Sequence, residues 1–190
     1  MRAKQISTDA TVSAAPAPLR IRLKRHADGS VALTCTRADG SKTWQRLSPT
    51  HGQVFPAHDL THLAVETILN YECGFYGLLS AGWEIGDFAK PWPRGPIPAE
   101  AREVELIVGL FDSERRMGET WSATEFVQQG KIYAAAQKGN RKSVEMPKLG
   151  EEAVARIRAV RGDLLARWAA TRPGDSIELF FPFGASLPNE

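Results

Sequence analysis

The sequence predicts an α+β protein in which a three- or four-stranded antiparallel sheet packs against about four or five helices. Alternating apolar and polar residues near the N-terminus predict strands, apolar residues at helical spacing fill the middle of the chain, and a short apolar segment near the C-terminus predicts a last strand. The composition agrees, because a chain of 190 residues with 43% hydrophobic and 24% charged residues is typical of globular proteins. It excludes disordered and collagen-like chains.

The N-terminal part predicts a leader and then a meander of strands. Residues 1–18 are rich in Ala, Ser, Thr and Pro without periodicity, so we expect a flexible leader before a single globular domain over 19–190. Strands are predicted over 19–26, 30–37 and 42–47, because two Asp-Gly turns separate the alternating segments. The C-terminal segment from Ser176 predicts a strand that pairs with this meander.

Four further segments predict the helices. From Ala57 the spacing of apolar residues predicts a long helix followed by a shorter one, with glycines between them. Another helix is predicted to start near Pro98, and Ser122 with Glu125 has the spacing of a capping box at the start of the next. The last helix is predicted over residues 149–171.

Several classes of protein lack support in the sequence. The net charge of +2 argues against a nucleic-acid partner, and neither a membrane span nor a secretory signal is present. Two distant cysteines predict no disulfide framework, so we expect a reducing, cytoplasmic environment. The glycine motifs of serine hydrolases, dinucleotide-binding folds and P-loops are also missing.

One group of residues points to metal chemistry. Two of the four histidines, His58 and His62, stand four positions apart in an apolar helical segment, so both imidazoles can reach one divalent ion. Asp59 and Glu66 accompany them as candidate catalytic residues, either as a general base or as groups that orient a ligand. The sequence therefore predicts a divalent metal site, with zinc as the expected cofactor.

A stable zinc site needs a third protein ligand, and spacing alone leaves several acids open. Glu84 and Asp87 are favoured as loop ligands because they follow an apolar turn. The other candidates are Glu72, Glu103 and Glu105.

The His-Asp-x-x-His spelling at 58–62 resembles two zinc motifs. It is similar to the His-Glu-x-x-His helix of zinc metalloproteases, with Asp59 in place of the Glu that activates water in that family. It is also similar to the zinc signature of a group of ubiquinone-biosynthesis proteins, which have a further Glu where this chain has Gly74. The resemblance implies bound zinc and covers only the five residues of the motif.

Two functions follow from this site. The first is a metal-dependent hydrolase or lyase acting on a small molecule or peptide, in which the metal lowers the pKa of a bound water toward ~7. The second is a non-enzymatic binding or assembly module in which the His, Asp and Glu side chains form a structural polar network, because buried polar groups must be paired.

The first predicted strand carries three basic residues. Arg20, Arg22 and Lys24 lie on its outward face, where they could contact phosphate groups. We expect them instead to protect a solvated strand edge against pairing with other strands.

Overall fold

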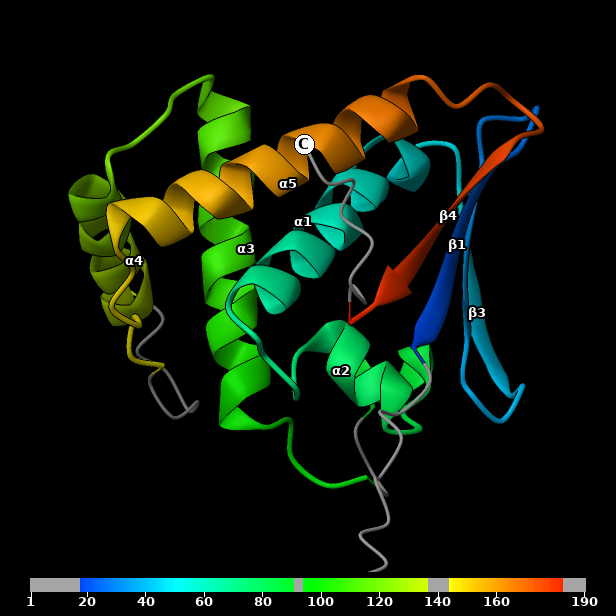
Figure 1. Ribbon diagram of the computed structural model, residues 1–190, viewed down its shortest axis with the longest axis horizontal. Helices are drawn as coiled ribbons and strands as arrows, with labels where there is room; N and C mark the ends of the chain where they lie inside the picture. The colour runs from blue at the N-terminus through cyan, green and yellow to red at the C-terminus, as the bar shows by residue number, and fades with distance from the viewer. Residues whose placement is uncertain (1–17, 91–93, 137–143, 183–190) are drawn as a thin grey trace, which may run out of the picture.

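The computed structural model describes residues 18–90, 94–136 and 144–182. The predicted leader lies outside these ranges except for Pro18. Within them the chain forms a four-stranded antiparallel sheet and five α-helices, which confirms the predicted α+β class. The helices lie on one side of the sheet (Figure 1).

The sheet joins the two ends of the described chain. Its strands are β1 (Leu19–Arg25), β2 (Val31–Thr36), β3 (Lys42–Leu47) and β4 (Ser176–Phe181), in the order β3-β2-β1-β4. The C-terminal strand therefore pairs with the N-terminal meander, as predicted, and β1 becomes an interior strand. The meander turns at Gly29 and Gly40, whose φ angles of 79° and 83° are in the left-handed region that favours glycine.

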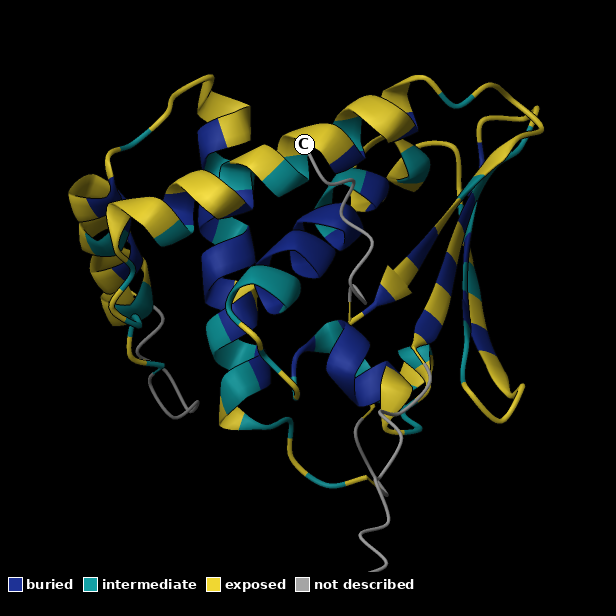
Figure 2. Ribbon diagram, in the orientation of Figure 1, coloured by how far each residue is buried: buried dark blue, intermediate teal, exposed yellow. Residues whose placement is uncertain are grey.

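The two faces of the sheet differ in burial, as the alternation predicted. Leu19, Ile21 and Leu23 of β1 are fully buried against the helices, while Arg20 and Arg22 between them are exposed. Figure 2 shows the alternation as blue and yellow bands along the strands. One face of the sheet thus belongs to the core and the other lies uncovered by the described helices.

The helices follow the predicted segments closely. The apolar stretch from Ala57 forms two helices, and two short 3₁₀ helices, η1 and η2, flank them. None of the described helices combines the length and hydrophobicity that crossing a bilayer requires. The helical elements are η1 (His51–Gln53), α1 (Phe55–Ile68), α2 (Phe75–Ser80), η2 (Ile85–Phe88), α3 (Ala99–Met117), α4 (Ala123–Ala136) and α5 (Glu151–Ala169).

Helix α1 lies in the middle of the molecule and carries the histidine pair. It packs against α3 and α5, and every residue from Asp59 to Glu66 is buried (Figure 2). Leu60, Leu63 and Ala64 of this helix join the same hydrophobic cluster as the inner face of the sheet. Four polar residues, Asp59, Thr61, His62 and Glu66, are therefore held inside the core, where each needs a partner.

Candidate metal centre

His58 and His62 lie one turn apart on α1 and face each other. Their Nε2 atoms are 3.2 Å apart, and the ring centroids are separated by 4.8 Å. His62 is 2% exposed, whereas His58 is 26% exposed, so the pair runs from the core toward the surface. The helical spacing thus brings two imidazole nitrogens to one point, as the sequence predicted.

The third group at this point is Glu105, which α3 provides. Its Oε1 lies 3.4 Å from Nε2 of His62, and its Oε2 lies 4.0 Å from Nε2 of His58. One ligand atom from each of the three side chains lies within 4.8 Å of the others. The structure therefore has a two-histidine, one-carboxylate group that is close enough to hold a metal ion.

Two more carboxylates hold the other ring nitrogens. Nδ1 of His58 lies 2.9 Å from Oδ2 of Asp112 on α3, and Nδ1 of His62 lies 3.2 Å from Oε1 of Glu66. A carboxylate on Nδ1 favours the tautomer whose proton is on Nδ1, which leaves the Nε2 lone pair free. Both histidines are thus oriented with their potential metal-binding nitrogens toward Glu105.

Glu66 is itself fixed by the start of α2. Its Oε2 accepts hydrogen bonds from the backbone N–H groups of Tyr76 (3.0 Å) and Gly77 (3.1 Å). The carboxylate also lies directly against Gly74, where an added Cβ would overlap it. Glycine at position 74 is therefore required by this close approach, and the turn between α1 and α2 seats the group that orients His62.

The pKa values around the pair reflect these contacts. Burial alone would lower the pKa of His62, but hydrogen bonds and negative charge from Glu105 and Glu66 outweigh it and raise the value to about 10. Burial is the largest single effect on Glu105 and Asp112 and raises their pKa values, but the hydrogen bonds and positive charges of His62 and His58 together outweigh it, so both pKa values are lowered. The site thus attracts positive charge, whether a proton or a metal ion.

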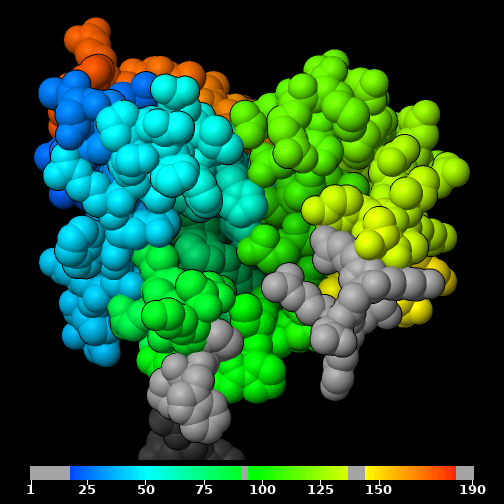
Figure 3. All heavy atoms as spheres, turned by 180° about the vertical axis from the view of Figure 1, so that it is seen from behind, coloured from blue at the N-terminus to red at the C-terminus, as the bar shows by residue number. Residues whose placement is uncertain are grey.

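The site opens on the side of Glu105. The Glu105 side chain is 56% exposed, and in Figure 3 the surface is hollowed between the segment that leads into α1 and helix α3. Aromatic rings border the pair: the Phe55 centroid lies 6.2 Å from that of His58, and the Phe75 centroid lies 5.5 Å from that of His62. A ligand reaching the histidines would meet apolar surface on both sides.

Asp59 lies next to His58 in the chain but outside the group of three ligands. It is 4% exposed, and burial raises its pKa to about 6. Its negative charge also raises the pKa values of Cys35 and Tyr76, after the larger effect of burial on each. Asp59 thus faces the core beneath the sheet, and its Oδ2 has no hydrogen-bond partner among the described residues.

Glu84 and Asp87, the favoured loop ligands, make other contacts. Glu84 lies 3.0 Å from the Arg37 guanidinium, and Asp87 lies 3.1 Å from that of Arg94. Both also cap η2, since each carboxylate accepts a backbone N–H of that turn. The structure brings Glu105, rather than these two acids, to the histidines.

Asp112 was missed by reasoning from the sequence. A signal was present, because Glu105 and Asp112 stand seven positions apart on a predicted helix and therefore share a face. That face could be connected with the histidines only once the packing of α3 against α1 was known.

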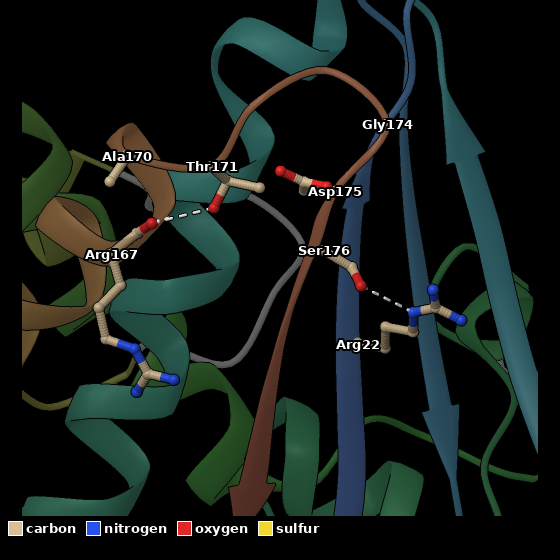
Figure 4. Close-up of a pocket in the computed structure, with 7 residues that line it drawn as sticks. All are labelled: Arg22, Arg167, Ala170, Thr171, Gly174, Asp175 and Ser176. Carbon is tan, nitrogen blue, oxygen red and sulfur yellow. Dashed lines mark hydrogen bonds between the residues drawn. The ribbon is translucent and has the colours of Figure 1, made fainter.

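A separate pocket of about 510 Å³ lies beside β4, between Arg22 of β1 and Arg167 of α5. Figure 4 shows the two guanidinium groups on opposite sides of β4, and Arg167 donates a hydrogen bond to the backbone carbonyl of Glu178 in that strand (3.4 Å). Arg22 donates a hydrogen bond to Ser176 (3.1 Å). The two cations therefore do not converge on one point, and this pocket lacks the arrangement found at the histidines.

Searches for similar proteins found no match among family models, curated proteins or solved structures.

Proposed function

We propose that the protein is a metal-dependent hydrolase, with zinc bound by His58, His62 and Glu105. The observation that carries this proposal is the pair of Nε2 atoms 3.2 Å apart, each on a ring whose Nδ1 faces a carboxylate. If both Nδ1 atoms carry protons, two lone pairs face each other, and a cation between them removes the repulsion. A metal ion supplies that cation and gains Glu105 as a third ligand.

Two of the three ligand separations support zinc as the metal, and the third, between Nε2 of His58 and Oε2 of Glu105, is 4.0 Å. Tetrahedral zinc with ligands at about 2.0–2.1 Å places them about 3.3–3.4 Å from one another. The two shortest separations here are 3.2 Å and 3.4 Å. Two histidines and a glutamate are also the ligand set of several zinc hydrolases, in which the fourth position holds water.

The expected chemistry follows from an open fourth position. A zinc ion held by His58, His62 and Glu105 would lower the pKa of a bound water toward about 7 and so supply hydroxide at neutral pH. That hydroxide would add to the carbonyl carbon of an ester or amide, the C–O or C–N bond would break, and the leaving alcohol or amine would take a proton from solvent. In this scheme Glu66 and Asp112 orient the imidazoles, while Asp59, which is buried in the core and has no hydrogen bond to either histidine, takes no direct step.

We also infer the class of substrate and the cellular compartment of the protein. The aromatic rings of Phe55 and Phe75 beside the site support a small molecule or peptide with an apolar group next to the carbonyl. Both cysteines are free, which supports a reducing, cytoplasmic environment.

The alternative is a non-enzymatic binding or assembly module. It is favoured by one observation: Glu105 and Glu66 together can hold a proton on His62 without any metal, as the raised pKa of that histidine indicates. In that case the cluster would be a buried polar network that stabilises the packing of α1 against α3.

The deciding experiment is metal analysis of protein purified without a histidine tag. We expect one equivalent of zinc, its loss in His58→Ala and His62→Ala, and its retention in the control His26→Ala. Ester hydrolysis should disappear with chelator and return with zinc. Absence of stoichiometric metal after incubation with zinc, together with a melting temperature that chelator does not change, would support the structural module instead.

A further inference from the structure

The outward face of the sheet is strongly basic. The described helices cover only the inner face, so the side chains at alternate positions of all four strands are exposed or half-buried (Figures 1 and 2). The only acid among these positions is Glu178 on β4. The basic residues, which we call the basic face, are Arg20, Arg22, Lys24, Lys42 and Arg46.

Protection of a strand edge does not explain this charge. Basic side chains protect edge strands because an edge has unpaired N–H and C=O groups. Arg20, Arg22 and Lys24, however, lie on β1, which is hydrogen-bonded to β2 on one side and to β4 on the other. The expectation from the sequence that they guard an edge is therefore wrong, and their concentration on an interior strand needs another reason.

Much of the positive charge on this face is available to a ligand. Arg20 pairs with Glu178 at 3.2 Å, and Arg46 pairs with Asp28 at 2.9 Å. Arg22, Lys24 and Lys42 have no ion pair with the part of the chain that the structure describes. The face consequently keeps an excess of positive charge although the whole chain has a net charge of only +2.

Two exposed aromatic side chains flank these cations. Trp44 on β3 is 67% exposed, and Phe180 on β4 is 44% exposed. The register places Trp44 opposite Thr34, which is opposite Arg22, while Phe180 lies opposite Arg20. Because β3 and β4 are the two outer strands and neighbouring strands are about 4.8 Å apart, the strands that carry the two rings are separated by about 14 Å across the basic face.

We propose that the basic face binds single-stranded nucleic acid. The arginines and lysines would contact phosphates, and Trp44 and Phe180 would stack on unpaired bases at either side. A single strand fits better than a duplex, since stacking on an aromatic ring requires an unpaired base. A lipid surface fits less well, because the polar residues Thr34 and Thr36 of β2 lie level with the two aromatic residues and between their strands.

This inference is independent of the metal centre, because it uses other residues on another side of the chain. The argument from the sequence against a nucleic-acid partner relied on the net charge of the whole chain. Net charge does not report how the cations are distributed, and the strand order gathers five of them on one face.

The test is fluorescence anisotropy of the full chain with labelled single-stranded DNA and RNA oligonucleotides of mixed sequence. We expect binding at low salt that weakens with a log–log slope of about −2 to −3.5, since each phosphate contact with a single strand contributes about −0.7. Trp44→Ala should weaken binding about tenfold, in line with the loss of one stacked base. Arg22→Glu with Lys24→Glu should abolish binding.

The matched control reverses two charges elsewhere: Lys131→Glu on α4 with Arg156→Glu on α5, both exposed. It should bind the oligonucleotides nearly as the unaltered chain does. The proposal would be overturned if the control lost as much oligonucleotide affinity as the Arg22 and Lys24 variant does. Absence of oligonucleotide binding by the unaltered chain at 50 mM salt would also overturn it. So would binding to anionic vesicles without binding to oligonucleotides, or self-association that Trp44→Ala abolishes.

Discussion

Glu66 connects a buried histidine to the start of another helix. One oxygen of its carboxylate lies 3.2 Å from Nδ1 of His62, and the other accepts the backbone N–H groups of Tyr76 and Gly77. The orientation of His62 therefore depends on the position of α2 as well as on α1. Groups that hold a ligating histidine through its second nitrogen normally affect metal affinity strongly.

The first prediction concerns this carboxylate. Glu66→Gln keeps the volume of the side chain, but its amide NH₂ must face either Nδ1 of His62 or the two backbone N–H groups, so at least one contact becomes repulsive. We expect zinc affinity to fall about 10- to 100-fold, measured by competition with a chromophoric chelator. The exposed Glu152→Gln is the control, and equal affinities of the two variants would contradict the orienting role.

The second prediction concerns Gly74. Alanine at this position would place its Cβ on the carboxylate of Glu66, which is fully buried and cannot move away freely. We expect Gly74→Ala to lower the free energy of unfolding by about 1–3 kcal/mol, measured by urea denaturation, and to weaken zinc binding as well.

Gly109→Ala is the matched control for that substitution. Gly109 lies within α3, and an added Cβ there has no neighbour within 4 Å. Since alanine favours the helix, this variant should be more stable by up to about 1 kcal/mol. Destabilisation of both variants to the same extent would show that Glu66 is not fixed as described.

The third prediction uses the two thiols. Cys35 is fully buried on β2 under the helices, and burial raises the pKa of its thiol to about 12, whereas Cys73 is partly exposed. In the native protein iodoacetamide should therefore modify Cys73 and leave Cys35 unmodified, as detected by mass spectrometry. Denaturant should make both reactive. If iodoacetamide modified Cys35 in the native protein as fast as Cys73, that result would contradict the packing of the helices on the sheet.

Local patterns predicted most of the fold. Strand alternation and helical spacing depend on neighbours within a few residues, so the strands of the meander, the helix from Ala57 and the final helix emerged close to their observed bounds. The His58 and His62 pair was found for the same reason, because a spacing of four residues in a helix fixes which side chains share a face.

The remainder of the site depends on packing over long distances in the sequence. Asp112 contacts His58 across 54 positions, and Glu105 reaches the pair only because α3 crosses α1. Glu84 and Asp87 were equally suitable by residue type, but Arg37 and Arg94 pair with them in the folded chain. Spacing cannot distinguish an acid that binds metal from one that caps a turn and pairs with an arginine.

The fourth prediction separates these acids directly. Glu105→Gln removes the negative charge from the proposed third ligand, and a neutral amide is a poor zinc ligand, so we expect zinc affinity to fall by at least about 100-fold. Glu84→Gln removes the charge from an ion pair of a half-exposed carboxylate with Arg37, keeps an oxygen that can cap η2, and should change zinc affinity less than twofold. Isothermal titration calorimetry with zinc measures the affinity of each variant. Both variants should first be shown to melt within a few degrees of the unaltered chain. Because Glu105 is 56% exposed, its replacement disturbs the core little, so loss of zinc binding would reflect the ligand itself. If Glu84→Gln lowered zinc affinity more than Glu105→Gln did, the third ligand would be Glu84 beside η2, and Glu105 would not bind the metal.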